Sequence, residues 1–383
     1  MTTPTFDPRG SGEPAPQQPT TPQAVTPQPV TPQTVMPQTG APMVAPAQVI
    51  GHPSAQLAVQ LDHVSKRFGD VIGANDISLH VATGTVLGVI GPSGAGKTTT
   101  IRMISGGLAA DSGTIRVLGE DPRRFSRRTR ESIGYMPQMF VLYPDLTAKE
   151  NVHFMASLFG IPPWRRGKRV DEALELVELS DARNRRASDM SGGMQRRLEL
   201  ACALVHQPSL LILDEPTAGI DPILRTKIWE EIDRRRQTGV TVLVTTQYVS
   251  EAEYCDAVAL ISDGDLIAHA TPTDLRKLAL GGEVIEVGTR EPIDVRRLPQ
   301  IPGVISIRQT GANSLLVVAD DAGLASPKVM DAVDQIGGTV EFSREYRPTF
   351  DEVFAELVTR HSEQREAAQQ AAAQSVAAQP VVA

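Results

Sequence analysis

The sequence predicts an α/β fold built around a doubly wound, mostly parallel sheet, and three observations lead to this prediction. Residues 85–90 and 210–213 are apolar runs without polar alternation, as expected for strands that are covered on both faces. Strand patterns and helical patterns alternate from residue 57 to residue 280, which is typical of parallel strands joined by helices. Glycine-rich or acidic segments follow both apolar runs, at the sheet edge where such folds bind ligands.

The individual elements follow from local periodicity. Residues 57–61 and 77–81 alternate between apolar and polar side chains, which predicts two strands with one solvated face. Between residues 140 and 189 the pattern becomes helical, and four apolar residues there recur at the spacing of one helix face: Val170, Ala173, Leu174 and Val177. The other predicted elements are strands at 85–90, 210–213 and 240–244 and helices at 97–105, 195–205 and 224–237.

Changes in composition divide the chain into four segments. Residues 1–56 are rich in Thr, Pro and Gln and poor in apolar side chains, which predicts a disordered tail. Residues 57–282 form the α/β domain. A small α+β domain is predicted for residues 283–360, with strands at 283–287, 304–307, 315–318 and 339–342 and a helix at 327–336. Residues 361–383 are rich in Ala and Gln and are expected to be a frayed helix or a second disordered tail.

Charge and cysteine content exclude several classes of protein. The formal charge is −8, from 45 acidic and 37 basic residues, so the chain lacks the overall basic character of a nucleic-acid-binding protein. Local basic clusters at residues 123–124, 127–130, 165–169 and 234–236 are interpreted as solvated faces; the alternative is that some of them face lipid headgroups or a membrane partner. The two cysteines, Cys202 and Cys255, have no metal-binding or redox spacing and suit a reducing cytosol.

Hydropathy predicts no membrane-spanning segment. The longest candidate, residues 198–213, is interrupted by Glu199, His206, Gln207 and Pro208, and falls short of the ~18 apolar residues that a span requires. The N-terminus lacks a basic region followed by an apolar core, so no secretory signal is expected. If the chain serves a membrane, we expect it to do so from the cytoplasm with a separate partner.

A phosphate-binding loop follows the apolar run at 85–90. Residues 91–98 fit the pattern GxxxxGK[ST], in which glycines let backbone N–H groups turn toward phosphate oxygens. Lys97 supplies a positive charge to the β- and γ-phosphates, and the Thr98 hydroxyl can ligate Mg²⁺. The predicted nucleotide-binding residues of this segment are Gly91, Pro92, Ser93, Gly94, Ala95, Gly96, Lys97, Thr98 and Thr99.

Two further motifs follow at a defined spacing. Asp214 and Glu215 end the apolar run at 210–213; the first can hold Mg²⁺ and the second can polarise a water molecule for attack on phosphorus. Upstream, the segment Ser191-Gly192-Gly193-Met194-Gln195 starts a predicted helix. Unpaired N–H groups, the helix dipole and a serine hydroxyl together make an anion-binding site.

Taken in this order, the motifs resemble those of the ATPase subunit of an ABC transporter. Residues 216–221 continue as the D-loop of that family does, and residues 347–354 are similar to the ending common in single-domain ATPases of drug, polysaccharide and lipid exporters. The resemblance implies a phosphate-loop NTPase core with antiparallel β and helical subdomains, ATP and Mg²⁺ as cofactors, and ATP hydrolysis that drives export. It also implies a separate integral-membrane permease, a second ATPase subunit that is identical or different, a place at the cytoplasmic face of the membrane, and no nucleic-acid partner.

The resemblance assigns roles to particular positions. Glu215, Lys97 and Gln247 form the catalytic set, although the family usually has a switch histidine where this chain has Gln247. Ser191, Gly192, Gly193 and Gln195 face the ATP held by the other subunit, so function implies a dimer. Thr98, Gln138 and Asp214 are the candidate Mg²⁺ ligands, and Phe68 is the candidate stacking partner of adenine. Residues 142–146, expected to be helical, are the candidate permease-docking surface.

Two alternatives stay open. A soluble ABC ATPase that acts on ribosomes or DNA usually has two ATP cassettes or a long coiled coil, whereas this chain has one phosphate loop and no sustained heptads. A non-hydrolysing, ATP-gated regulatory subunit is suggested by Gln247, since an amide can donate a hydrogen bond to phosphate but cannot carry the charge of an imidazolium.

Overall fold

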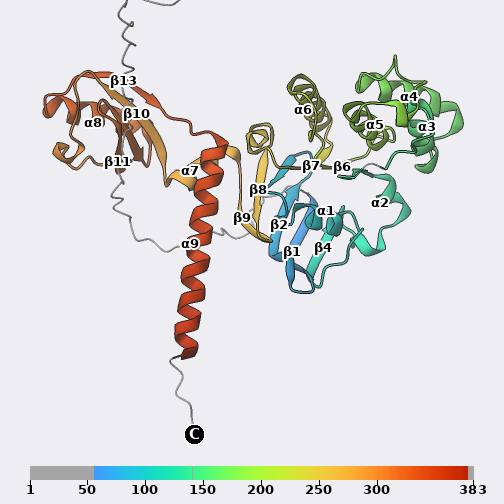
Figure 1. The fold of residues 1–383 in the computed structure, drawn as a ribbon, viewed down its shortest axis with the longest axis horizontal. Helices are drawn as coiled ribbons and strands as arrows, with labels where there is room; N and C mark the ends of the chain where they lie inside the picture. The colour runs from blue at the N-terminus through green and yellow to red at the C-terminus, as the bar shows by residue number, and fades with distance from the viewer. Residues whose placement is uncertain (1–55, 140, 378–383) are drawn as a thin grey trace, which may run out of the picture. The chain divides into compact units, whose positions relative to one another are not determined.

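The computed structural model describes residues 56–139 and 141–377, and its larger sheet has the strand order β4-β1-β2-β9-β8-β3-β7-β6-β5 (Figure 1). The strands of this sheet are β1 (Leu57–Phe68), β2 (Val71–Ala82), β3 (Val86–Ile90), β4 (Ser112–Val117), β5 (Ile133–Met136), β6 (Leu210–Asp214), β7 (Thr241–Thr246), β8 (Ala257–Ser262) and β9 (Asp265–Ala270). Its helices are α1 (Lys97–Ile104), α2 (Arg127–Glu131), α3 (Ala148–Leu158), α4 (Pro163–Leu176), α5 (Gly192–Leu204), α6 (Pro222–Gln237) and α7 (Pro272–Leu280). The predicted tail at residues 1–55 and the chain end at 378–383 lie outside the described residues.

The middle of the sheet is parallel, as the sequence predicts. Strands β8, β3, β7, β6 and β5 pair in parallel, and every residue of β3, β6, β7 and β8 is buried. Strands covered on both faces need apolar side chains at every position, and this explains the unbroken apolar runs. The flanking strands β4, β1 and β2 pair antiparallel and form the antiparallel β subdomain.

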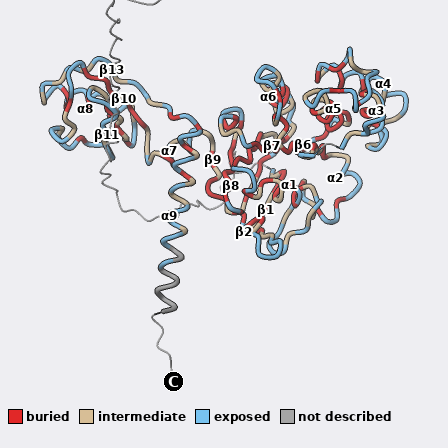
Figure 2. Tube along the Cα trace, in the orientation of Figure 1, coloured by how far each residue is buried: buried red, intermediate tan, exposed pale blue. Residues whose placement is uncertain are grey.

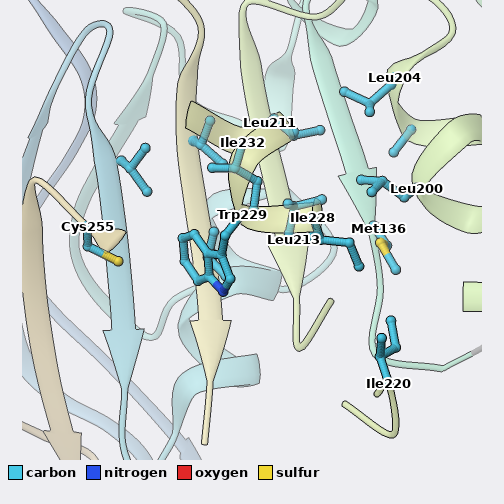
Figure 3. Packing of buried hydrophobic residues seen from close by; sticks show 14 of the residues in the cluster. Met136, Leu200, Leu204, Leu211, Leu213, Ile220, Ile228, Trp229, Ile232 and Cys255 are labelled. Carbon is cyan, nitrogen blue, oxygen red and sulfur yellow. The ribbon is translucent and has the colours of Figure 1, made fainter. Parts of the chain in front are cut away.

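Two hydrophobic layers cover the opposite faces of the parallel strands. On β6, Leu211 and Leu213 belong to one buried cluster, whereas Leu210 and Ile212 belong to the other. Figure 3 shows the first layer, in which Trp229 and its neighbours on α6 pack against β7 and β3. In Figure 2 the buried residues follow β6 and β7, while α3 and α4 carry exposed stretches. Alternate residues of a strand therefore pack into different layers, and both faces of the sheet are covered. Because these strands are parallel, their carboxyl ends lie at the same edge of the sheet.

A β-hairpin joins the parallel strands to the antiparallel part, and the sequence interpretation did not include it. β8 and β9 pair antiparallel around a turn at Asp263 and Gly264, whose φ values are 50° and 84°. An Asp-Gly pair between two apolar segments is the strongest local signal for such a hairpin, so the information was present in the sequence.

The smaller sheet has the order β11-β12-β10-β13 and is antiparallel. Its elements are β10 (Glu283–Thr289), β11 (Val304–Gly311), β12 (Ser314–Ala319), α8 (Ala322–Gln335) and β13 (Val340–Glu345). The predicted helix at 327–336 in fact begins five residues earlier. Asp321 caps the helix by accepting a hydrogen bond from Leu324 N, at 2.9 Å, so Pro327 lies inside the helix rather than at its start.

The last described helix corrects the expected boundary of the second tail. α9 spans Phe350–Ala377, so residues 361–377 are helical rather than disordered. Phe350, Val353 and Leu357 belong to the same buried cluster as the core of the larger sheet, and His361 Nε2 lies 3.2 Å from Asp265 Oδ2 on β9. Ala and Gln are good helix formers, and docking of the first turns removes the cost of starting the helix.

A second correction concerns residues 142–146, which were expected to be helical. They lie in an irregular segment between β5 and α3. Pro144 lacks a backbone donor, and Thr147 starts α3 with a capping box to Glu150 that fixes the first helical turn at Ala148. Within the described ranges, no helix is long and apolar enough to cross a membrane.

Candidate active site

Five of the predicted site residues come together at the carboxyl ends of β3, β7, β6 and β5: Lys97, Thr98, Gln138, Asp214 and Glu215. Neighbouring strands are in register there, because Ile90 pairs with Thr246, Asp214 with Thr245, and Met136 with Leu213. The loops that leave these strands therefore start side by side, which is where open α/β sheets place their ligands.

The phosphate loop needs glycine for two separate reasons. Gly94 and Gly96 have φ values of 81° and 105°, in the left-handed region. A Cβ atom at Gly96 would lie 2.3 Å from the Gly73 carbonyl oxygen, and one at Gly91 would lie 2.0 Å from the Ile261 carbonyl oxygen. No side chain caps α1, so the N–H groups of its first turn remain available to an anion.

Lys97 is buried and lies between the loop and two carboxylates. Its Nζ donates hydrogen bonds to the carbonyl oxygens of Gly91 (2.8 Å) and Pro92 (2.9 Å), and it lies 3.9 Å from Glu215 Oε1. Burial lowers the pKa of Lys97, while the charges of Glu215 and Asp214 act in the opposite direction. The lysine thus carries the compensating charge for both carboxylates and lies next to the phosphate-binding backbone.

Three oxygen atoms around Asp214 form a set that suits Mg²⁺. The Thr98 hydroxyl lies 3.4 Å from Asp214 Oδ1 and 3.5 Å from Gln138 Oε1, too far for good O–H···O hydrogen bonds. Asp214 is fully buried, and its Oδ2 has no hydrogen-bond partner among the described residues. A hydroxyl, a carboxylate and an amide oxygen are hard ligands of the kind Mg²⁺ prefers, so these residues fit the ion.

Glu215 is fixed by contacts with residues at the ends of two strands, β5 and β7. Its Oε2 accepts a hydrogen bond from Gln138 Nε2 at 3.1 Å, and its backbone N–H is bonded to Thr245 Oγ1 at 2.9 Å. Its φ is +53°, an unfavourable backbone conformation for a residue with a Cβ atom, which the surrounding contacts must hold in place. The carboxylate is thereby turned toward Lys97 rather than into solvent.

The Ser-Gly-Gly segment starts α5, and the structure does not bring it to the phosphate loop. Ser191 caps the helix by accepting from Met194 N at 3.4 Å, and Gln195 Nε2 donates to the Ala187 carbonyl at 2.8 Å. Ser191 and Gly192 are exposed, and no hydrogen bond joins Ser191 to the cluster around Lys97 in the part of the chain that the structure describes.

Phe68 and Gln247 lie near the site without direct contact to its centre. Phe68 is half exposed at the end of β1, and a Cβ atom at Gly73 would lie 2.8 Å from its ring and 3.0 Å from Thr99 of α1. Gln247 is exposed directly after β7, two residues from the Thr245 that contacts Asp214 and Glu215.

Three residues of the site were missed by sequence reasoning. Thr245 Oγ1 donates to Asp214 Oδ1 at 2.5 Å, and a buried pair on α5, Arg196 and Glu199, contacts the loops that carry Gln138 and Glu215. A charged pair three residues apart is common on solvated helix faces, so the sequence pattern alone did not distinguish this buried pair.

Comparison with known proteins identifies the family of this chain. A family model described as "ABC transporter" matches residues 74–218. The chain is 36% identical over 326 residues to the daunorubicin resistance ATP-binding protein DrrA3 of Streptomyces coeruleorubidus, and the alignment covers 82% of this chain and 100% of DrrA3. The chain belongs to the ABC transporter ATP-binding proteins. The predicted family, ATP as the ligand and the mostly parallel α/β fold are thereby confirmed.

Two other relatives show how far the likeness of this ABC ATP-binding protein extends. It is 37% identical over 228 residues to the probable multidrug ABC transporter ATP-binding protein YbhF of Escherichia coli (strain K12), and this alignment covers 60% of the chain but only 39% of YbhF. The dimeric post-hydrolysis structure of the ATP-binding cassette MJ0796 bound to ADP and Pi has a TM-score of 0.52 and 26% identity, covering 56% of this chain and 98% of that one. The alignments with these relatives thus cover different shares of this chain, from 56% to 82%.

Proposed function

We propose that this protein hydrolyses ATP between two ATPase subunits and thereby drives export through a separate membrane permease. One observation carries the proposal: Lys97, Asp214 and Glu215 cluster in one part of the chain, whereas the anion-binding start of α5 at Ser191 is exposed. A second chain is needed to bring the two halves of a nucleotide site together. The dimeric state named for the MJ0796 cassette supports the subunit arrangement, and the daunorubicin resistance named for DrrA3 and the multidrug transport named for YbhF support the direction of transport.

Each residue has a distinct role in the proposed site. Thr98, Gln138 and Asp214 would hold Mg²⁺, which would supply charge that offsets the phosphate oxygens. Lys97 exchanges its loop carbonyls for the β- and γ-phosphates, because phosphate oxygens are charged acceptors and the carbonyls are neutral. Glu215 orients a water molecule and accepts its proton as the water oxygen bonds to the γ-phosphorus, while the bond from that phosphorus to the β–γ bridging oxygen breaks and ADP leaves.

The permease is proposed to dock beside Gln138, which places the subunit at the cytoplasmic face of the membrane. Tyr143 and Phe154 are exposed and their rings contact each other, with centroids 4.9 Å apart. Further large apolar side chains of the same segment of the chain are exposed: Met139, Val141, Leu158 and Trp164. Exposed apolar side chains gathered in one segment indicate a protein interface, and this segment is continuous with the loop that carries a candidate Mg²⁺ ligand.

This docking surface is tested by the change Tyr143→Asp. A carboxylate buried against an apolar permease segment costs at least about 1.4 kcal/mol, so we expect at least tenfold less permease to co-purify with the variant from detergent extracts. The control Leu324→Asp changes another exposed apolar residue, on α8, and should leave co-purification unchanged. Equal permease recovery with Tyr143→Asp would exclude this surface.

The second candidate function, an ATP-gated regulatory subunit, rests on Gln247. We expect the wild-type protein with its permease to hydrolyse ATP well above a Glu215→Gln control, because lysine, carboxylate and serine are all present. Gln247→Ala should lower kcat about tenfold, the value of one hydrogen bond to a charged oxygen. Gln247→His should keep turnover at least at the wild-type level and add a pH dependence centred near the ordinary histidine pKa of about 6.5. Wild-type turnover equal to the Glu215→Gln control would favour the regulatory role.

A further inference from the structure

Arg196 is a buried arginine on α5 whose guanidinium reaches two different loops of the candidate site. Its NH2 group donates to the carbonyl oxygens of Asp214 and Glu215, the second at 2.8 Å. Its NH1 group donates to the carbonyl of Pro137 at 2.8 Å and lies 3.4 Å from that of Gln138. One planar cation therefore holds the main chain on both sides of the Gln138–Glu215 hydrogen bond.

Glu199, one turn further along α5, completes the arrangement. Its Oε2 lies 2.9 Å from Arg196 NH1, and its Oε1 accepts from the backbone N–H of Val141 at 3.0 Å. Both side chains are nearly inaccessible to solvent. Each partner compensates the buried charge of the other, and the carbonyl and N–H groups of the loops satisfy their remaining hydrogen-bonding capacity.

The position of the pair on α5 gives it a mechanical role. Ser191 caps the same helix five residues before Arg196, a distance of about 8 Å along a rigid helix. A displacement of the helix start is therefore transmitted to Arg196, and Arg196 moves the carbonyls of Glu215 and Gln138 with it. The left-handed backbone of Glu215 makes its carboxylate sensitive to such a shift.

We propose that the Arg196–Glu199 pair positions Gln138 and Glu215 according to the position of α5, and so links the two nucleotide sites of the dimer. This inference rests on the proposed function, in which Ser191 contacts the ATP held by the partner subunit. The partner's ATP fixes the position of the first residues of α5. When this position changes, Arg196 moves with the helix and shifts the catalytic carboxylate of its own chain. Arg196 is thus a positioning residue rather than a catalytic one.

The neighbouring Arg197 provides a matched control. It lies on the same helix, but its NH1 donates to the carbonyls of Val177 (3.1 Å) and Glu178 (3.3 Å), which belong to the end of α4 and not to the site. A change there disturbs α5 to a similar degree without touching the loops of Gln138 and Glu215.

The test uses the full-length protein with the double change Arg196→Met/Glu199→Gln. The double variant removes both buried charges together, and the amide oxygen that replaces the Glu199 carboxylate can still accept from Val141 N–H. We expect kcat to fall on the order of 100-fold, the usual cost of a small misplacement of a catalytic group. The dissociation constant for ATP should stay within about threefold, and the Hill coefficient for ATP should fall to about 1.

The companion variant Arg196→Lys keeps the positive charge beside Glu199 and so preserves the fold, but a lysine cannot span four carbonyls. It should show the same loss of kcat and of cooperativity with a wild-type melting temperature. Wild-type kcat and Hill coefficient in either folded variant, or an equal loss in Arg197→Met, would overturn the inference. A failure of the proposed dimer gives a different result. In that case the association state of the wild-type protein would not change when ATP is added.

Discussion

Replacing Glu215 with Gln is expected to lower kcat for ATP hydrolysis by about 10²- to 10⁴-fold, the range that removal of a general base produces. The amide keeps the shape of the side chain and can still form a hydrogen bond with Gln138, so ATP affinity should change little. The loss therefore falls on turnover and not on binding. Steady-state hydrolysis and equilibrium ATP binding by the same preparation measure the two quantities.

The control for this change is Glu253→Gln. Glu253 is an exposed carboxylate paired with Arg276, at 2.7 Å, on the surface of the same domain. The control should retain wild-type turnover. Turnover by Glu215→Gln at the wild-type rate would assign the proton-accepting role to another group.

Replacing Lys97 with Met is expected to raise the dissociation constant for ATP roughly 10- to 100-fold. Each hydrogen bond from a charged donor to phosphate contributes about 1.5–3 kcal/mol, and no other lysine lies on the phosphate loop. The change also leaves Asp214 and Glu215 without their nearest positive charge, because Lys97 Nζ lies 3.9 Å from Glu215 Oε1. ATP binding by calorimetry measures the effect, and a melting curve shows whether the variant is folded.

Lys227→Met is the matched control for Lys97→Met. Lys227 forms an ion pair with Glu178 at 2.6 Å on the surface, where such pairs contribute little to stability. It should bind ATP as the wild type does. Unchanged ATP affinity in a folded Lys97→Met variant would contradict the role given to the phosphate loop.

The sequence predicted the parallel core because its strands are covered on both faces. Such strands need apolar side chains at every position, so β3, β6 and β7 appear as unbroken runs with functional loops at their ends. The residues of the phosphate loop are contiguous, and their chemistry can be read without knowledge of the fold. The same holds for Asp214 and Glu215 at the end of β6.

What the sequence did not predict depends on contacts between distant segments. Arg196 bonds to carbonyls 58 residues before it and 18 residues after it. Every residue has a backbone carbonyl, so the sequence does not indicate which of them accept these hydrogen bonds. The part of α9 after residue 360 was expected on composition to be a frayed helix or disordered, and it instead continues a helix whose first turns pack three apolar residues into the ATPase core. α8 starts before Pro327 because the cap at Asp321 outweighs the loss of one backbone donor.

The most direct test of the whole account is the association state of the Glu215→Gln protein with and without ATP and Mg²⁺, measured by sedimentation velocity alone and together with its permease. The account predicts a dimer with ATP that dissociates when the nucleotide is removed, and no ATP-dependent dimer when Ser191→Glu is added, because a carboxylate repels the phosphate that the serine would face. A Glu215→Gln protein that stays monomeric with saturating ATP, both alone and with the permease, would contradict it.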